Sequence, residues 1–96
     1  MMAAGVLAAA TEARIAVPAT LAVAGFDDMP IAARLSPALT SVHIPWRTMA
    51  HDAVRRLFAS HLTPEPMIYP APILERPSTA MPTPDLSRSA LDPGRV

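Results

Sequence analysis

The stretch LAVAGFDDMP, residues 21–30, decides the fold, because an unbroken apolar run ends at two aspartates and a proline. Such a short apolar run between turn signals is typical of a strand covered on both faces, as in a parallel sheet. In open α/β sheets, ligands bind in the crevice at the carboxyl ends of the strands. We therefore ask whether Asp27 and Asp28 lie at the mouth of such a crevice.

Two interpretations of these aspartates stay open on spacing alone. A carboxylate at the end of a strand accepts strong, charge-assisted hydrogen bonds from hydroxyl or ring N–H groups of a ligand. Asp also caps helices and stabilises turns, and one helical turn is predicted near residues 30–34. Asp28 is the better candidate for a cap, and Asp27 is the better candidate for ligand contact.

The elements around this strand predict an α/β domain. A helix is predicted over residues 2–14, and its nearly all-round apolar surface indicates burial. A second strand is predicted over residues 38–44, followed by an amphipathic helix over residues 46–62, which Trp46 packs on the sheet. This order is typical of a mostly parallel sheet flanked by helices.

Proline shapes the C-terminal third of the chain. Short strands are predicted over residues 67–69 and 73–76, and neighbouring prolines keep them at a sheet edge. After Thr79 the composition turns to Pro, Ser, Asp and Arg, which predicts a disordered tail over residues 81–96. We expect one structural unit over residues 1–80, followed by that tail.

Composition argues against several classes of function. The 96 residues carry eight basic and eight acidic side chains, so no basic excess supports direct contact with DNA. Cysteine is absent, which excludes disulfides and thiolate catalysis. No apolar run reaches the about 18 residues that a membrane span needs, and no basic segment precedes the apolar N-terminus as in a secretory signal. We expect no membrane contact.

The other reactive side chains lack the context that catalysis or metal binding needs. The spacing of His51 and His61 does not place them on one helix face, and His43 lies apart in a strand. The serines lack a Gly-x-Ser-x-Gly context, and there is no Gly-rich phosphate loop. We therefore expect no catalytic residue, no metal site and no cofactor, in a protein that is not an enzyme.

Several segments, ordered along the chain, carry a resemblance to a known family. They are AAGVL at residues 3–7, VPATLAVAGFDDMPIAARLSPALTSV at residues 17–42, the spaced Pro45, Met49, Ala53 and Leu57, and PILERPST at residues 72–79. Together they resemble the C-terminal end of LacI/GalR-family transcription regulators. There, an apolar strand ends in Gly-aromatic-Asp, and Pro-x-Leu-Thr-Thr/Ser-Val, an amphipathic helix and Leu-x-x-Arg-x-Ser/Thr follow.

The resemblance implies a partial periplasmic-binding-protein-like C-terminal subdomain. In the family, two α/β subdomains close over a small effector, usually a sugar, nucleoside or purine. Closure changes how a dimer presents its helix-turn-helix domains to DNA. Asp27 matches the effector-contacting aspartate of the family. Ala4 and Ala8 on the first helix, and Ile31 and Leu35 in the loop, match regions that family members use for dimerisation.

The sequence also departs from the family. The helix-turn-helix domain and the N-terminal subdomain do not appear in it, so we expect a fragment of a cytoplasmic regulator without direct DNA contact. Half a cleft leaves an effector exposed to water, so the chain alone is expected not to bind sugars with useful affinity. Without the helix-turn-helix domain it is also expected not to bind operator DNA. Ile44 replaces a polar residue common in the family, and Ala50 replaces a glycine.

Two other functions stay open from the sequence. One is a stand-alone interaction module, in which the chain forms a homodimer or pairs with a full-length family member. The other is a fragment of an exported sugar-binding protein, although the LTSV and ERPST segments favour the regulator.

Overall fold

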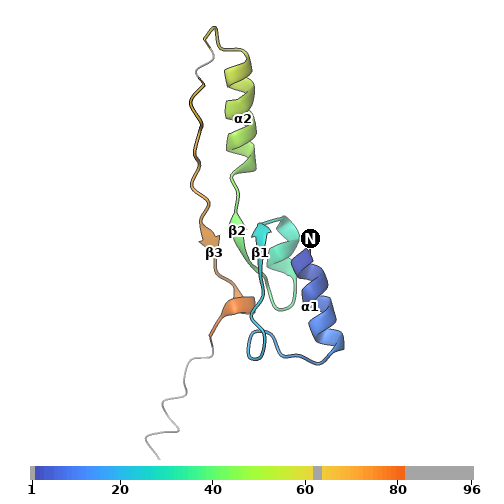
Figure 1. Ribbon diagram of the computed structural model, residues 1–96. Coiled ribbons are helices and arrows are strands. Elements are labelled where there is room, and N and C mark those ends of the chain that lie inside the picture. The colour runs from blue at the N-terminus through green and yellow to red at the C-terminus, as the bar shows by residue number, and fades with distance from the viewer. Residues whose placement is uncertain (1, 62–63, 82–96) are drawn as a thin grey trace, which may run out of the picture.

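The computed structural model describes residues 2–61 and 64–81 (Figure 1). Its elements are α1 (Met2–Glu12), β1 (Ala24–Asp27), the 3-10 helix η1 (Pro30–Arg34), β2 (Thr40–His43), α2 (Trp46–Leu57), β3 (Ile73–Leu74) and the 3-10 helix η2 (Pro77–Thr79). The predicted α/β class and the helical turn at residues 30–34 are confirmed. The predicted tail lies outside the described residues, apart from Met81.

The three strands form one sheet in the order β1-β2-β3. β1 and β2 are parallel, with Gly25 opposite Ser41 and Asp27 opposite His43. β2 and β3 are antiparallel, so the sheet is mixed, whereas the sequence predicted a mostly parallel one. The difference arises because the chain turns after α2 and runs back beside it toward β3 (Figure 1).

The strands are shorter than predicted because other segments take up their backbone groups. β1 starts at Ala24, since the amide of Val23 donates to the carbonyl of Ser78 at 3.1 Å and not to a strand. The predicted strand at residues 67–69 is wrong. Prolines surround it and cannot donate to a ladder, although the amide of His43 still donates to the Pro72 carbonyl at 2.8 Å.

The core lies where α1, β1 and η1 meet. Leu7, Val23, Ala32 and Leu39 form it, each 4–6% exposed. Gly25 permits the close approach, because a Cβ there would lie 2.9 Å from Leu39 Cδ2. Only one stripe of α1 is buried, so the predicted all-round burial of this helix is wrong. The sheet covers one side of the helix and leaves the other open.

α2 extends beyond the sheet, and none of its residues is buried. Trp46 is 54% exposed, so the prediction that it packs the helix on the sheet is wrong. The sequence pattern located the apolar face of α2 but not the surface that covers it. No helix within residues 2–61 and 64–81 has the length and apolar character needed to cross a membrane.

Residues 64–72, which we call the arm, run beside α2 in an extended conformation (Figure 1). The hydroxyl of Tyr69 donates to Asp52 Oδ2 at 2.9 Å. The guanidinium of Arg56 donates to the carbonyl of Glu65, also at 2.9 Å. Polar contacts therefore hold the arm against α2.

Candidate functional site

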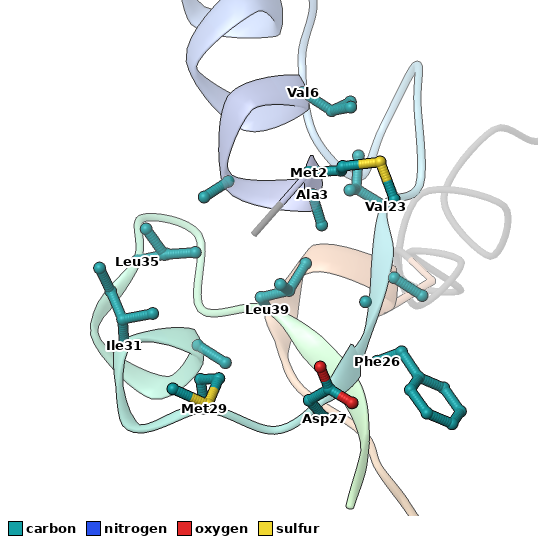
Figure 2. A pocket seen from close by; sticks show the side chains of 14 residues that line it. Met2, Ala3, Val6, Val23, Phe26, Asp27, Met29, Ile31, Leu35 and Leu39 are labelled. Atoms are coloured by element: carbon teal, nitrogen blue, oxygen red, sulfur yellow. The ribbon is translucent and has the colours of Figure 1, made fainter.

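A groove of about 640 Å³ opens between α1, β1 and η1 (Figure 2). The residues of the described chain that line it are Met2, Ala3, Ala4, Val6, Val23, Ala24, Gly25, Phe26, Asp27, Met29, Ile31, Ala32, Leu35 and Leu39. Asp27 is the one charged residue among them. A single carboxylate in an apolar wall is an arrangement that fixes the orientation of a bound molecule.

The groove brings together most of the residues that the sequence singled out. Asp27 at the end of β1, Ala4 on α1, and Ile31 and Leu35 from the η1 region all line it. Ala8 does not line the groove and is exposed on α1. Figure 2 shows Asp27 and Met29 at one end of the groove and α1 at the other. The aspartate therefore sits at the rim of an otherwise apolar surface.

The backbone at this rim has an uncommon conformation. Asp27 has φ 89° and Asp28 has φ 49°, so two consecutive non-glycine residues lie in the left-handed region. Asp tolerates this region better than most residues. Each such residue still costs on the order of 1–3 kcal/mol unless its surroundings hold it. Contacts made by Asp28 supply such surroundings.

Asp28 contacts two residues of β2 and one residue of the segment after β3. His43 Nδ1 donates to Asp28 Oδ2 at 2.9 Å, and Arg76 Nη2 donates to Oδ1 at 2.7 Å. The amide of Asp28 donates to the hydroxyl of Ser41 at 3.0 Å. We call these four residues the Asp28 clasp. The prediction that Asp28 caps a helix is wrong, because η1 has no side-chain cap.

The clasp is built around an ionised carboxylate. The hydrogen bond from His43, and then the hydrogen bond from Arg76, hold the pKa of Asp28 below its ordinary value. Burial acts in the opposite direction and is outweighed. The side chain of Asp28 is 11% exposed, so these charge-assisted contacts are partly screened from water.

The sequence did not reveal the clasp. The sequence indicates His43 only as a candidate metal ligand, and Arg76 only as part of the ERPST segment. One signal was present: the sequence holds an arginine, Arg76, between Pro72 and Pro77, and two adjacent carboxylates, Asp27 and Asp28, with which such a cation can pair. Spacing does not say which carboxylate it meets, because that depends on the pairing of β2 with β3.

The described residues contain no group of side chains that could bind a metal ion. Within residues 2–61 and 64–81, no three His, Asp or Glu side chains are grouped to hold a metal ion. In the clasp, the carboxylate and imidazole already bind each other, and the guanidinium of Arg76 repels a cation.

Comparison with known proteins decides the family. The sequence model of the periplasmic binding protein-like domain matches residues 1–79. The chain belongs to this family. In open α/β sheets, ligands bind outside the carboxyl ends of the strands, and Asp27 lies at such an end of β1.

The relatives of this periplasmic binding protein-like domain are regulators. The chain is 51% identical over 52 residues to the HTH-type transcriptional regulator GalS of Salmonella typhimurium, covering 54% of this chain and 15% of the relative. It is 44% identical over 57 residues to the HTH-type transcriptional regulator MalR of Streptomyces coelicolor, covering 59% of this chain and 17% of the relative. The chain thus spans about a sixth of their length.

A solved structure agrees with these matches. The crystal structure of a transcriptional regulator of the LacI family from Burkhoderia phymatum has a TM-score of 0.70 and 37% sequence identity to this chain. The match covers 83% of this chain and 30% of that one. The resemblance to LacI/GalR-family regulators is therefore confirmed.

Proposed function

We propose that residues 1–80 form part of the effector-binding and dimer-forming domain of a LacI-family transcription regulator. The observation that carries this proposal is the position of Asp27, at the carboxyl end of a parallel strand and at the rim of an apolar groove. The regulators with which the chain shares its sequence and fold support it. In this proposal the chain itself makes no contact with DNA and acts in the cytoplasm.

The effector is a small molecule rich in hydroxyl or N–H groups, such as a sugar or a nucleoside. Asp27 accepts hydrogen bonds from these groups. A hydrogen bond to a charged group contributes about 1.5–3 kcal/mol, so Asp27 affects affinity strongly. An effector acts as a signal only when it binds one arrangement of the regulator better than another.

The dimer forms through the apolar face around the groove. Ala4 and Ala8 are small residues on α1 that let a second copy approach closely, and Ile31 and Leu35 add apolar surface. Ile31 is 44% exposed in the single chain. Burial of such surface contributes about 25 cal/mol per Å², so a second copy of the chain is favoured on this face.

The test uses the full-length product of the gene that encodes this chain. Isothermal titration with D-galactose, D-ribose and adenosine measures effector binding. Asp27→Ala is expected to weaken the binding of the responding compound by about tenfold to a hundredfold. Asp52→Ala is the matched control, because Asp52 lies on α2 and contacts the arm. Equal affinities for Asp27→Ala and the unsubstituted protein would contradict the assignment.

The exposed face of α2 favours a second candidate function, an interaction module that pairs with a full-length regulator. Val54, Leu57 and Phe58 are 52%, 75% and 85% exposed. An apolar surface of this kind marks a protein interaction site. Co-expression with a full-length LacI-family regulator tests it. Leu57→Asp should abolish co-purification and Ile15→Asp should preserve it, whereas equal recovery of both variants would rule the function out.

A further inference from the structure

The left-handed backbone at residues 27–28 needs an explanation in local contacts. Asp27 and Asp28 have φ 89° and 49°, and neither is a glycine. Such a pair persists only where the surrounding structure fixes it. Asp27 belongs to the end of β1, whose pairing with β2 ends at His43. What fixes the pair must therefore act just after the strand.

Asp28 is fixed through both its backbone and its side chain. Its amide donates to Ser41 Oγ at 3.0 Å, and Ser41 is 1% exposed. Its carboxylate binds His43 at 2.9 Å and Arg76 at 2.7 Å, one partner for each oxygen. A residue held at three points by three side chains has little freedom to rotate about φ. The residue before it inherits that constraint through the shared peptide plane.

The partners of Asp28 are themselves anchored. Arg76 Nη1 donates to the carbonyl of Leu39 at 2.8 Å, and the amide of Arg76 donates to Thr40 Oγ1 at 2.8 Å. Thr40 Oγ1 in turn donates to the carbonyl of Arg76 at 3.0 Å. Arg76 is therefore held at the start of β2 by contacts that do not involve Asp28. The clasp is a rigid support and not a loose surface ion pair.

We propose that Asp28 is a positioning residue, which holds Asp27 in the left-handed conformation and so directs the Asp27 carboxylate to the rim of the groove. Asp27 and Asp28 have separate tasks: the first binds effector, and the second fixes the direction from which it does so. The effector part of this inference rests on the proposed function. The conformational part does not, since it concerns the chain without ligand.

Nuclear magnetic resonance on the isotopically labelled chain tests the inference. A residue with positive φ has its amide and Hα protons close together, so it gives a strong intraresidue nuclear Overhauser effect between them. Asp28→Asn is expected to reduce this effect at Asp27 by about twofold or more, as the backbone leaves the left-handed region. Arg76→Gln should do the same, and Arg76→Lys should restore it in part. Asp52→Asn, the same chemical change on α2, should leave Asp27 unaffected.

A second variant decides the matter if Asp28→Asn fails to fold. The side chain of His43 is 47% exposed, so His43→Gln removes one contact of the clasp from a water-accessible position. It is expected to weaken the effect at Asp27 while amide shifts in α1 persist. An unchanged effect at Asp27 in a folded clasp variant would overturn the inference. This experiment uses no effector, so its failure is distinct from a failure of the proposed function in the titrations.

Discussion

The hydroxyl of Ser78 accepts the amide hydrogen of Thr40 at 2.8 Å, although the two residues lie 38 positions apart. The same hydroxyl donates to the carbonyl of Val23 at 2.6 Å, and Ser78 is 0% exposed. The amide of Ser78 donates to the carbonyl of Ala38 at 3.0 Å. One small polar residue in η2 therefore joins the start of β2 to the residue before β1.

Replacing Ser78 by Ala should destabilise the chain. The change leaves the amide of Thr40 without its bond to the Ser78 hydroxyl in a buried place, and a lost buried partner costs about 1–3 kcal/mol. Urea unfolding followed by circular dichroism should show a lower midpoint. Ser60→Ala, on an exposed residue, is the matched control. Equal midpoints for the two variants would contradict the importance of Ser78.

The stability of the chain should depend on the ionisation of Asp28. The pKa of Asp28 is lowered in the folded state, first by the hydrogen bond from His43 and then by that from Arg76. An unfolded Asp has a pKa of about 3.9. The ionised carboxylate therefore stabilises the fold above about pH 4. This stabilisation is lost as the pH falls through the lower folded pKa.

Urea midpoints measured between about pH 6 and pH 3 check this dependence. Asp28→Asn cannot ionise, so its midpoint should be lower near neutral pH and should change less on acidification. The pH dependence would be assigned to other carboxylates if Asp28→Asn followed the same curve as the unsubstituted chain.

The pKa of Tyr69 should show whether the arm contacts α2 in solution. Tyr69 is the only tyrosine, so phenolate absorbance follows one group. Burial, and then the hydrogen bond to Asp52, raises the pKa of Tyr69. Asp52→Asn removes the neighbouring negative charge, so the pKa should fall toward its ordinary value. Alkaline titration measures it. A titration curve that does not move would mean that the arm leaves α2 in solution.

Self-association should depend on the groove face. Ile31→Asp places a charge in the apolar surface around the groove and should weaken a dimer by about tenfold or more, or at least about 1.4 kcal/mol. Sedimentation equilibrium measures the dissociation constant. Ile68→Asp makes the same change on the arm, where Ile68 is 90% exposed, and should have little effect. A larger effect of Ile68→Asp would move the dimer face to the arm.

The features that sequence could predict are those with a local cause. The apolar run 21–26 and the aspartates after it predicted a strand that ends at a polar rim, and Pro30 predicted the start of η1. The expected contact of Trp46 with the sheet failed, because an amphipathic pattern shows only that a helix has an apolar face. The surface that covers this face depends on the path of the chain after α2, which the helix pattern does not show.

The clasp was beyond sequence for a related reason. Asp28 and Arg76 meet because β3 returns antiparallel to β2, which places the backbone of Arg76 beside Thr40 at the start of β2, and the Arg76 side chain reaches Asp28 from there. The preference of Asp for helix caps predicted a cap at Asp28, because this preference reflects only partners nearby in the sequence. The contacts that override it come from 15 positions away in the case of His43 and from still farther along the chain in the case of Arg76.

The hydrogen bonds of Ser78 to Thr40 and Val23 have a consequence for biosynthesis. A ribosome delivers α1, β1 and β2 long before the η2 segment, so these elements emerge with the Thr40 amide and the Val23 carbonyl still lacking the Ser78 hydroxyl. Contacts between distant parts of a chain form slowly and leave apolar surface open meanwhile. The nascent chain therefore exposes apolar surface until Ser78 has left the ribosome, and a chaperone protects it most during that interval.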